Sequence, residues 1–145
     1  MHDIESDKIF IAPNIPEKKL NNAITKYAQN ISKDDVIALI DDTVFGSAND
    51  GILATKNSII IHEAFSKPYL ILYSDIKSLY CDENKIYINN RMVTKLIVPG
   101  KYDIEKFCQF INKIINYLLG NSDLENVRHT SCYTSFLQRI QAKAR

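Results

Sequence analysis

The stretch Leu39–Ile76, which reads LIDDTVFGSANDGILATKNSIIIHEAFSKPYLILYSDI, decides the fold class, because short apolar runs alternate with polar corners along its whole length. Two of these corners are strong turn signals. Ser47–Gly51 ends in Asp-Gly, and Lys56-Asn57 predicts a tight reversal. The apolar runs around them predict strands over residues 52–55, 58–63 and 69–73. The stretch therefore predicts an antiparallel meander.

The same texture continues on both sides of this stretch. Downstream, strand pieces are predicted over residues 76–80, 85–88 and 92–98, with turns at 82–84 and 89–90 and a stop at Pro99-Gly100. Upstream, Ser32–Asp35 fits either the cap of a helix or the approach to a buried strand, and periodicity leaves the choice open. The β-prone Thr43–Phe45 favours a strand over residues 36–42. About seven strands then curl into a barrel or sandwich.

Helical patterns flank the strands. Residues 1–15 read as a lead-in with a short apolar patch at Ile9–Ile11, and Pro16 suits the first turn of a helix. The amphipathic helix that follows has its apolar positions at Leu20, Ala23, Ile24, Tyr27, Ala28 and Ile31. A long helix is predicted from Asp103, as N-cap, to about Leu119, with Gly120 beyond its end. A further tail helix is expected after the cap signature at Ser122–Glu125.

These patterns predict an α+β chain in three parts: residues 1–33 as lead-in and helix, 34–119 as the sheet domain with its capping helix, and 120–145 as a helical tail. A chain of 145 residues with 46% hydrophobic residues can bury a core without staples. The net charge of +1 gives no strongly basic balance, so no nucleic-acid partner is expected. No apolar run approaches transmembrane length and no signal peptide is recognised, which favours a cytoplasmic protein.

The text of residues 39–76 resembles small bacterial pleckstrin-homology-like (PH-like) domains. The matching positions are Asp50-Gly51-Ile52, Thr55, Ile59–Ile61 and Tyr73–Ile76, and Asn89-Asn90 stands where such domains turn before their last strand. The resemblance covers roughly residues 34–119 and implies a fold of helix, curled antiparallel sheet and capping helix. It also implies binding roles, mostly protein or membrane contacts. Residues 46–51 are polar and acidic where lipid-binding relatives have a basic cluster, so phosphoinositide recognition is not expected.

The motifs for metal or acid–base chemistry fail on spacing. Asp41, Asp42, Asp50 and Asp75 are read as strand ends and turn residues, since a metal site needs carboxylates that converge. His62-Glu63 is not followed by a second His at zinc-site spacing, and His62 is expected to point outward from its strand. No phosphate-binding glycine motif is present. We therefore expect no metal, no cofactor and no catalytic residues.

The three cysteines are expected to be reduced thiols. Cys108 lies on the apolar stripe of the long helix and is read as core. Cys81 follows a strand beside Asp82 and Glu83, which would raise its pKa. Cys132, near His129, is the least implausible nucleophile, although both are expected near the start of a helix.

Two features point to binding. Six of the tyrosines form one of them, because Tyr suits interfaces, although β-rich domains also favour it in strands: Tyr69, Tyr73, Tyr80, Tyr87, Tyr102 and Tyr133. The tail helix is the other, with an apolar face of Tyr133, Phe136, Leu137 and Ile140 and a basic side of Arg139, Lys143 and Arg145. The tail either packs on its own domain, docks a partner or a second copy, or lies on a membrane surface.

The sequence thus favours a non-catalytic intracellular module that binds an unidentified protein or associates with itself as a homo-oligomer, through an exposed strand edge or the tail. The residues expected to make the contact are Tyr133, Phe136, Leu137, Arg139 and Ile140. A membrane-surface or lipid-headgroup adaptor is the alternative. A small metal-dependent hydrolase has the weakest support.

Overall fold

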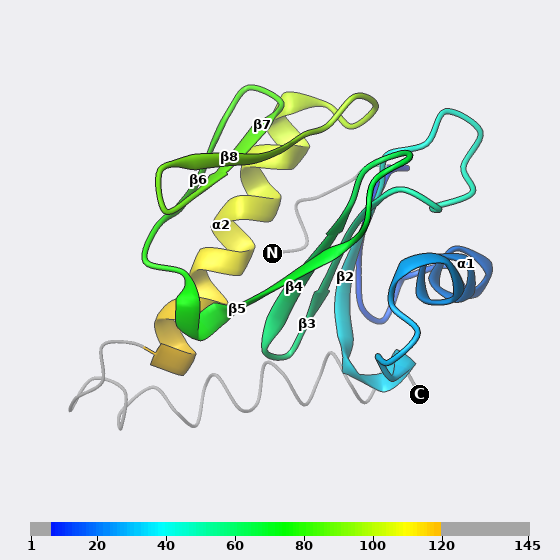
Figure 1. The fold of residues 1–145 in the computed structure, drawn as a ribbon, viewed down its shortest axis with the longest axis horizontal. Helices are drawn as coiled ribbons and strands as arrows, with labels where there is room; N and C mark the ends of the chain where they lie inside the picture. The colour runs from blue at the N-terminus through cyan, green and yellow to red at the C-terminus, as the bar shows by residue number, and fades with distance from the viewer. Residues whose placement is uncertain (1–6, 120–145) are drawn as a thin grey trace.

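The computed structural model describes residues 7–119, which form two α-helices and two antiparallel sheets (Figure 1). The first sheet has the strand order β1-β2-β3-β4-β5. Its strands are β1 (Ile9–Ile11), β2 (Val36–Asp41), β3 (Gly51–Thr55), β4 (Ser58–His62) and β5 (Tyr69–Leu72). The second sheet, in the order β6-β7-β8, is a meander of β6 (Leu79–Asp82), β7 (Lys85–Ile88) and β8 (Arg91–Lys95).

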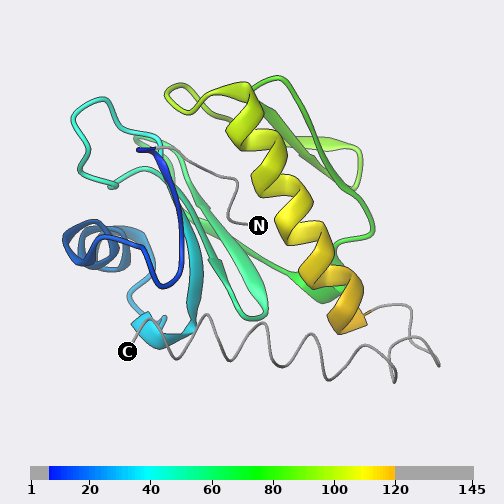
Figure 2. The ribbon, with the colours of Figure 1, turned by 180° about the vertical axis from the view of Figure 1, so that it is seen from behind.

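The two helices lie on opposite sides of the first sheet. Helix α1 (Glu17–Tyr27) packs on the outer side, and α2 (Lys101–Leu119) lies on the other side together with the second sheet (Figures 1 and 2). Strands β2, β3 and β4 are therefore buried on both faces along their full length. This double burial explains why they read as continuous apolar runs with no alternation of apolar and polar residues.

Two cores follow from this layering. The larger core fills the space between the first sheet, the second sheet and α2. The smaller core lies between α1 and the outer face of the first sheet, and its buried members are Ala23, Tyr27, Ala28, Val36, Leu39, Ala48, Leu53 and Ile60. A short 3₁₀ turn, η1 (Lys33–Asp35), precedes β2, and a second one, η2 (Tyr73–Asp75), follows β5.

Two turn positions have a clear physical reason. Asn89 and Asn90 both have positive φ, 54° and 66°, which is the pair that joins β7 to β8 in a two-residue hairpin. Gly51 opens β3 with φ of 141°, and a Cβ there would lie 1.9 Å from the Ile40 carbonyl oxygen. Only glycine permits this approach of β3 to β2.

The α+β class and most strands agree with the sequence predictions. Where the sequence left a barrel or a sandwich open, the strands form two separate antiparallel sheets. No closed barrel forms within residues 7–119. The expected lead-in contains an edge strand, β1, which pairs with β2 in register Ile9↔Ile40. A lone apolar patch gives no local signal of this long-range pairing.

The boundaries of several elements also differ. Helix α1 ends at Tyr27, so Ile31 lies beyond it, and α2 begins at Lys101, which puts Asp103 in the first turn. Ser32 caps the η1 turn before β2, where its hydroxyl accepts the N–H of Asp34. Residues 73–78 hold η2 and a loop where a strand was expected from 76. Within the described residues, no helix combines the length and apolarity needed to cross a bilayer.

Candidate functional site

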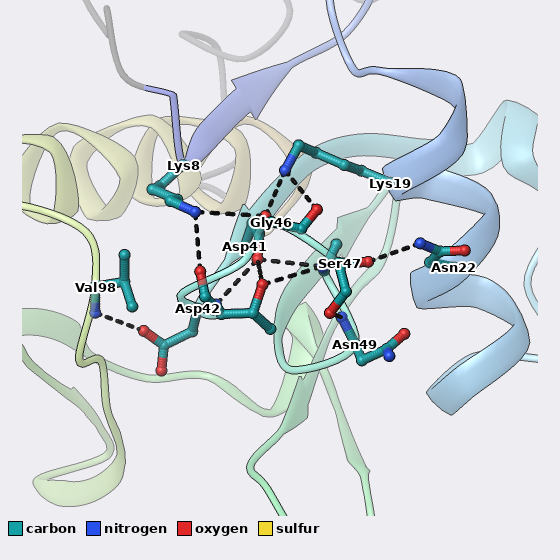
Figure 3. Close-up of polar contacts among 11 residues, drawn as sticks. Lys8, Lys19, Asn22, Asp41, Asp42, Gly46, Ser47, Asn49 and Val98 are labelled. Atoms are coloured by element: carbon teal, nitrogen blue, oxygen red, sulfur yellow. Dashed lines mark hydrogen bonds and ion pairs between the residues drawn. The ribbon is translucent and has the colours of Figure 1, made fainter.

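A buried carboxylate organises the loop between β2 and β3 (Figure 3). The Asp41 side chain is fully buried, and Lys19 Nζ lies 2.6 Å from its Oδ2 atom, with Lys8 Nζ at 3.9 Å. Its Oδ1 atom accepts the backbone N–H groups of Thr43 at 3.0 Å and Ala48 at 3.2 Å. Burial raises the pKa of Asp41, but the hydrogen bonds from Lys19 and Thr43 outweigh it and hold the pKa below its ordinary value. Asp41 is thus a structural hub.

Side chains from α1 and from the segment before β1 hold the same loop. Lys19, on α1, also donates to the Gly46 carbonyl at 2.8 Å, and Asn22 of the same helix donates to the Ser47 carbonyl at 2.9 Å. Lys8, just before β1, donates to the Thr43 carbonyl at 2.9 Å. Because the lysines are committed to this internal network, the loop offers no free basic cluster of the kind that captures phosphate groups.

Asp42 joins this loop to the segment that enters α2. Its Oδ1 atom accepts the N–H groups of Ile97 at 2.7 Å and Val98 at 2.8 Å. Burial raises the pKa of Asp42, and the two N–H donors oppose the rise. The β4–β5 loop comes to the same end of the molecule, since Thr94 of β8 donates to Glu63 at 3.3 Å.

The β2–β3 loop, the β4–β5 loop and the segment between β8 and α2 therefore meet at one end of the fold, visible at the top of Figures 1 and 2. Each of them exposes apolar side chains. Phe45 is 98% exposed and Phe65 is fully exposed. Val44 and Ile97 are also largely exposed. We call Val44, Phe45, Phe65 and Ile97 the loop-tip patch. Apolar side chains exposed on neighbouring loops can serve as an interaction surface.

His62 lies beneath this loop end and points outward from its strand, as predicted, but it is buried. It does face away from the larger core, but α1 covers that side of the sheet, and the Tyr27 ring stacks on it with centroids 5.0 Å apart. His62 Nδ1 lies 2.9 Å from the Asn49 carbonyl and 3.1 Å from Asp50 Oδ1. These contacts give His62 a structural role.

The Tyr27 hydroxyl is also buried, and it has no hydrogen-bond partner among the described residues. Burial, followed by the charges of Asp41 and Asp50, raises the pKa of Tyr27. The hydroxyl therefore remains neutral over the whole physiological range.

The predicted carboxylate set separates in space. Asp41, Asp42 and Asp50 lie near the loop end, while Asp75 is in η2, beyond the far end of β5. Each of the first three is engaged by a lysine, a backbone amide or His62. Among residues 7–119, no group of three or more His, Cys, Asp or Glu side chains is placed to hold a metal ion.

The two described cysteines meet across the interface of β6 and α2. Cys108 is buried in the larger core, as predicted, and Cys81 is partly buried against it. Burial raises the pKa of both thiols, and for Cys81 the carboxylates of Glu105 and Asp82 add to the rise. Neither thiol has the electropositive setting of a nucleophile. Cys132 lies outside the described residues.

The tyrosines divide between structural and exposed positions. Tyr73 is in the larger core, where its hydroxyl donates to the Thr55 carbonyl at 2.5 Å. Tyr80 and Tyr87 stack with centroids 5.0 Å apart, and Tyr102 is exposed. The Tyr69 hydroxyl donates to the Val93 carbonyl and so ties β5 to the second sheet. Tyr69 lies on an edge strand of the first sheet and Tyr80 on an edge strand of the second, and both are partly exposed.

The edge that carries Tyr69 is the second candidate surface. Strand β5 is the last strand of the first sheet and is partly exposed along its length. Leu70 and Leu72 stand opposite Ile60 and Ser58, so they face the α1 side of the sheet, where they are 49% and 41% exposed. We call Tyr69, Leu70 and Leu72 the β5 edge. A cavity of about 160 Å³ opens beside it, lined by Tyr27, Ala28, Gln29, Asn30, Ile31, Ile60, Pro68, Tyr69 and Leu70.

The contact residues predicted from the tail, Tyr133, Phe136, Leu137, Arg139 and Ile140, lie outside the described residues. Sequence reasoning expected an exposed strand edge but did not identify β5, and it missed the loop-tip patch. A signal was present at Phe65, which stands in the corner 65–68 between two predicted strands, where a large apolar side chain has no strand or helix face to join. Phe45 was counted instead with the β-prone run Thr43–Phe45.

No protein-family model, no curated protein and no solved structure gave a significant match to this chain.

Proposed function

We propose that this chain is a non-catalytic intracellular binding module that contacts protein through the β5 edge. The observation that carries the proposal is an exposed, uncharged apolar strand, Tyr-Leu-Ile-Leu, at the edge of a sheet. Edge strands present unpaired backbone groups, and folded proteins usually protect them with charge, proline or cover. Within β5 none of the side chains is charged. Such a strand suits the addition of an extended partner segment, with leucine side chains as anchors.

The opposite edge of the sheet makes a useful contrast. Strand β1 has three residues, and Ile9 in it is buried. Lys8 precedes it and is tied to the β2–β3 loop. A short edge beside a fixed lysine is a poor template for pairing, which leaves β5 as the better candidate.

We also propose a PH-like architecture. In support, the run β2–β5 forms four consecutive strands of one sheet, a three-stranded sheet follows, and α2 closes the core against both. Strand β1, at the edge of the first sheet, and α1, on its outer face, would be additions to that architecture. The non-catalytic reading is supported by the internal roles of the groups that could do chemistry, His62, Asp41, Asp42 and Cys108.

A photocrosslinking amino acid at Leu72, introduced into the chain in its own cells, tests the proposal. We expect one protein, which can be a second copy, to be crosslinked and then to bind the purified chain. The double variant Leu70→Lys/Leu72→Lys should weaken that binding at least about tenfold, the loss of roughly 1.4 kcal/mol of binding free energy. Met92→Lys is the matched control, since Met92 is an exposed apolar residue of β8.

The proposal fails if no species is crosslinked from position 72 and sedimentation shows a strict monomer at all concentrations. It also fails if Met92→Lys weakens binding as much as the β5 variant does.

The loop-tip patch favours a second candidate function, a membrane-surface adaptor. Protruding aromatic tips suit the interfacial layer of a bilayer, which adapts to separate points of contact. Phe45→Ser/Phe65→Ser should then abolish co-sedimentation with vesicles of mixed zwitterionic and anionic lipid, while Met92→Ser leaves it unchanged. Equal recovery of the wild type and both variants in the supernatant would exclude this function.

A further inference from the structure

The outer face of the first sheet is only partly covered. Helix α1 packs over Leu39, Leu53 and Ile60, which belong to β2, β3 and β4. Leu70 and Leu72 of β5 face the same side and remain about half exposed, at 49% and 41%. The apolar surface thus extends one strand beyond the helix that covers it, and the cavity between Ile31 and Leu70 marks the margin of that helix.

The chain leaves the described structure close to this uncovered strand. Helix α2 ends at Leu119. It packs against η2, which directly follows β5, and both views show the end of α2 beside that turn (Figures 1 and 2). Residues 120–145 therefore start next to the Leu72 end of β5. Residues 120–132 can span roughly 40 Å when extended, so reach does not limit where the apolar positions after them can bind.

The segment carries a stripe that matches the uncovered strand in length and chemistry. Tyr133, Phe136, Leu137 and Ile140 follow the i, i+3, i+4, i+7 spacing of one helix face. Those eight positions rise about 12 Å in a helix, and the four residues of β5 span about 13 Å. The basic residues Arg139, Lys143 and Arg145 would stay in solvent. The β5 edge itself contains no charged side chain, so an uncharged stripe is its complement.

We propose that residues 120–145 of the same chain dock this stripe on Leu70 and Leu72 and over the adjacent cavity. The occupant of the β5 edge in the isolated protein is then its own C-terminal segment. Where this edge is also the partner surface, which rests on the function proposed above, a partner binds only by displacing the segment. The segment therefore weakens that binding, because the free energy of its docking is subtracted from the free energy of partner binding.

The absence of tryptophan from the chain allows a direct test. Leu72→Trp, in the full chain, places a single indole on the β5 edge. We expect this indole to be protected from acrylamide. Adding Phe136→Asp/Leu137→Asp should raise its quenching constant several-fold and shift its emission to the red. Gln138→Asp is the matched tail control and should change neither. Met92→Trp reports a surface on β8 and should be quenched equally in both tail backgrounds.

Equal quenching of the Leu72→Trp indole with the intact and the altered tail overturns the proposal. Protection that disappears on dilution also overturns it, in favour of docking by a second copy. Should the Asp variant lose its fold by circular dichroism, Ile140→Asp replaces it. A synthetic peptide of residues 130–145, added to the Leu72→Trp chain that carries either set of tail substitutions, must restore protection of the indole.

The two proposals fail separately. Loss of the tail proposal leaves the crosslink from Leu72 to a partner intact, whereas loss of the partner proposal leaves the indole protected. If both hold, Phe136→Asp/Leu137→Asp should strengthen partner binding.

Discussion

Lys19 Nζ lies 2.6 Å from Oδ2 of Asp41, and this contact ties helix α1 to the end of β2 across the outer face of the first sheet. The Asp41 side chain is fully buried and that of Lys19 is 20% exposed. A buried carboxylate with its partner removed keeps its desolvation cost and loses most of the compensating interaction. Lys19→Met should therefore lower the free energy of unfolding by about 2–4 kcal/mol in a urea titration.

Lys18 provides the control for this variant. It is the exposed neighbour of Lys19 on α1, so Lys18→Met should change the unfolding free energy by less than about 0.5 kcal/mol. An equal effect of the two variants would mean that the Lys19 contact contributes nothing beyond the general charge of α1.

Asp41 and Asp42 should act on acid stability in opposite directions. The pKa of Asp41 is lowered by folding, so it contributes stability that is present above its unfolded pKa and is lost as pH falls through its folded value. The pKa of Asp42 is raised, so acidification relieves a cost, and its contribution is lost as pH rises through the folded value. Asp41→Asn should thus flatten the fall of stability below about pH 4. Asp42→Asn should steepen the fall of stability just above about pH 4, between the unfolded pKa of the carboxyl and its raised folded value.

The measurement is the unfolding free energy by urea at several pH values between about 2 and 6, the range in which carboxyl groups titrate. If both variants change the slope of the unfolding free energy against pH in the same direction, the opposite pKa shifts assigned to these neighbouring carboxyls are wrong.

Buried tyrosine hydroxyls offer a contrast that does not depend on charge. The Tyr27 hydroxyl has no hydrogen-bond partner among the described residues, whereas the Tyr73 hydroxyl donates to the Thr55 carbonyl. Tyr27→Phe removes an unsatisfied polar group, so stability should stay the same or rise by up to about 1 kcal/mol. Tyr73→Phe leaves a buried carbonyl with one bond fewer and should cost about 1–3 kcal/mol. Thermal unfolding of the two variants side by side checks the order.

The sequence predicts those elements whose signals are local. Asp50-Gly51, Lys56-Asn57 and Asn89-Asn90 mark reversals that the structure places between paired strands. The apolar stripe of α2 predicted the start of the long helix to within three residues, because 3.6-residue periodicity is a property of the helix alone. Cys108 was recognised as core for the same reason.

The features that were missed depend on contacts distant in sequence. Strand β1 forms only because β2 offers an edge, and η2 interrupts the chain where it changes from the first sheet to the second. His62 was placed on the correct face of β4, but its burial requires α1 to lie over that face. The three loops of the loop-tip patch are brought together by Asp42 and Thr94, whose bonds cross 55 and 31 residues of sequence.

Gly51 should be the least replaceable of the three glycines in the described residues. Its φ of 141° is strained for any other residue, and a Cβ there would stand 1.9 Å from the Ile40 carbonyl oxygen, which belongs to the neighbouring strand. Gly51→Ala must either push β3 away from β2 or rotate the backbone at the base of the β2–β3 loop. Either change costs at least about 3 kcal/mol, since it combines backbone strain with a clash in the centre of the sheet.

Gly100→Ala is the matched control, because nothing lies within 4 Å of a Cβ at that position. The expected result in urea is a large loss of stability for Gly51→Ala and less than about 1 kcal/mol for Gly100→Ala. A Gly51→Ala protein as stable as the wild type would show that β2 and β3 do not pair in the register described, and with it the placement of Asp41 at the loop base would be lost.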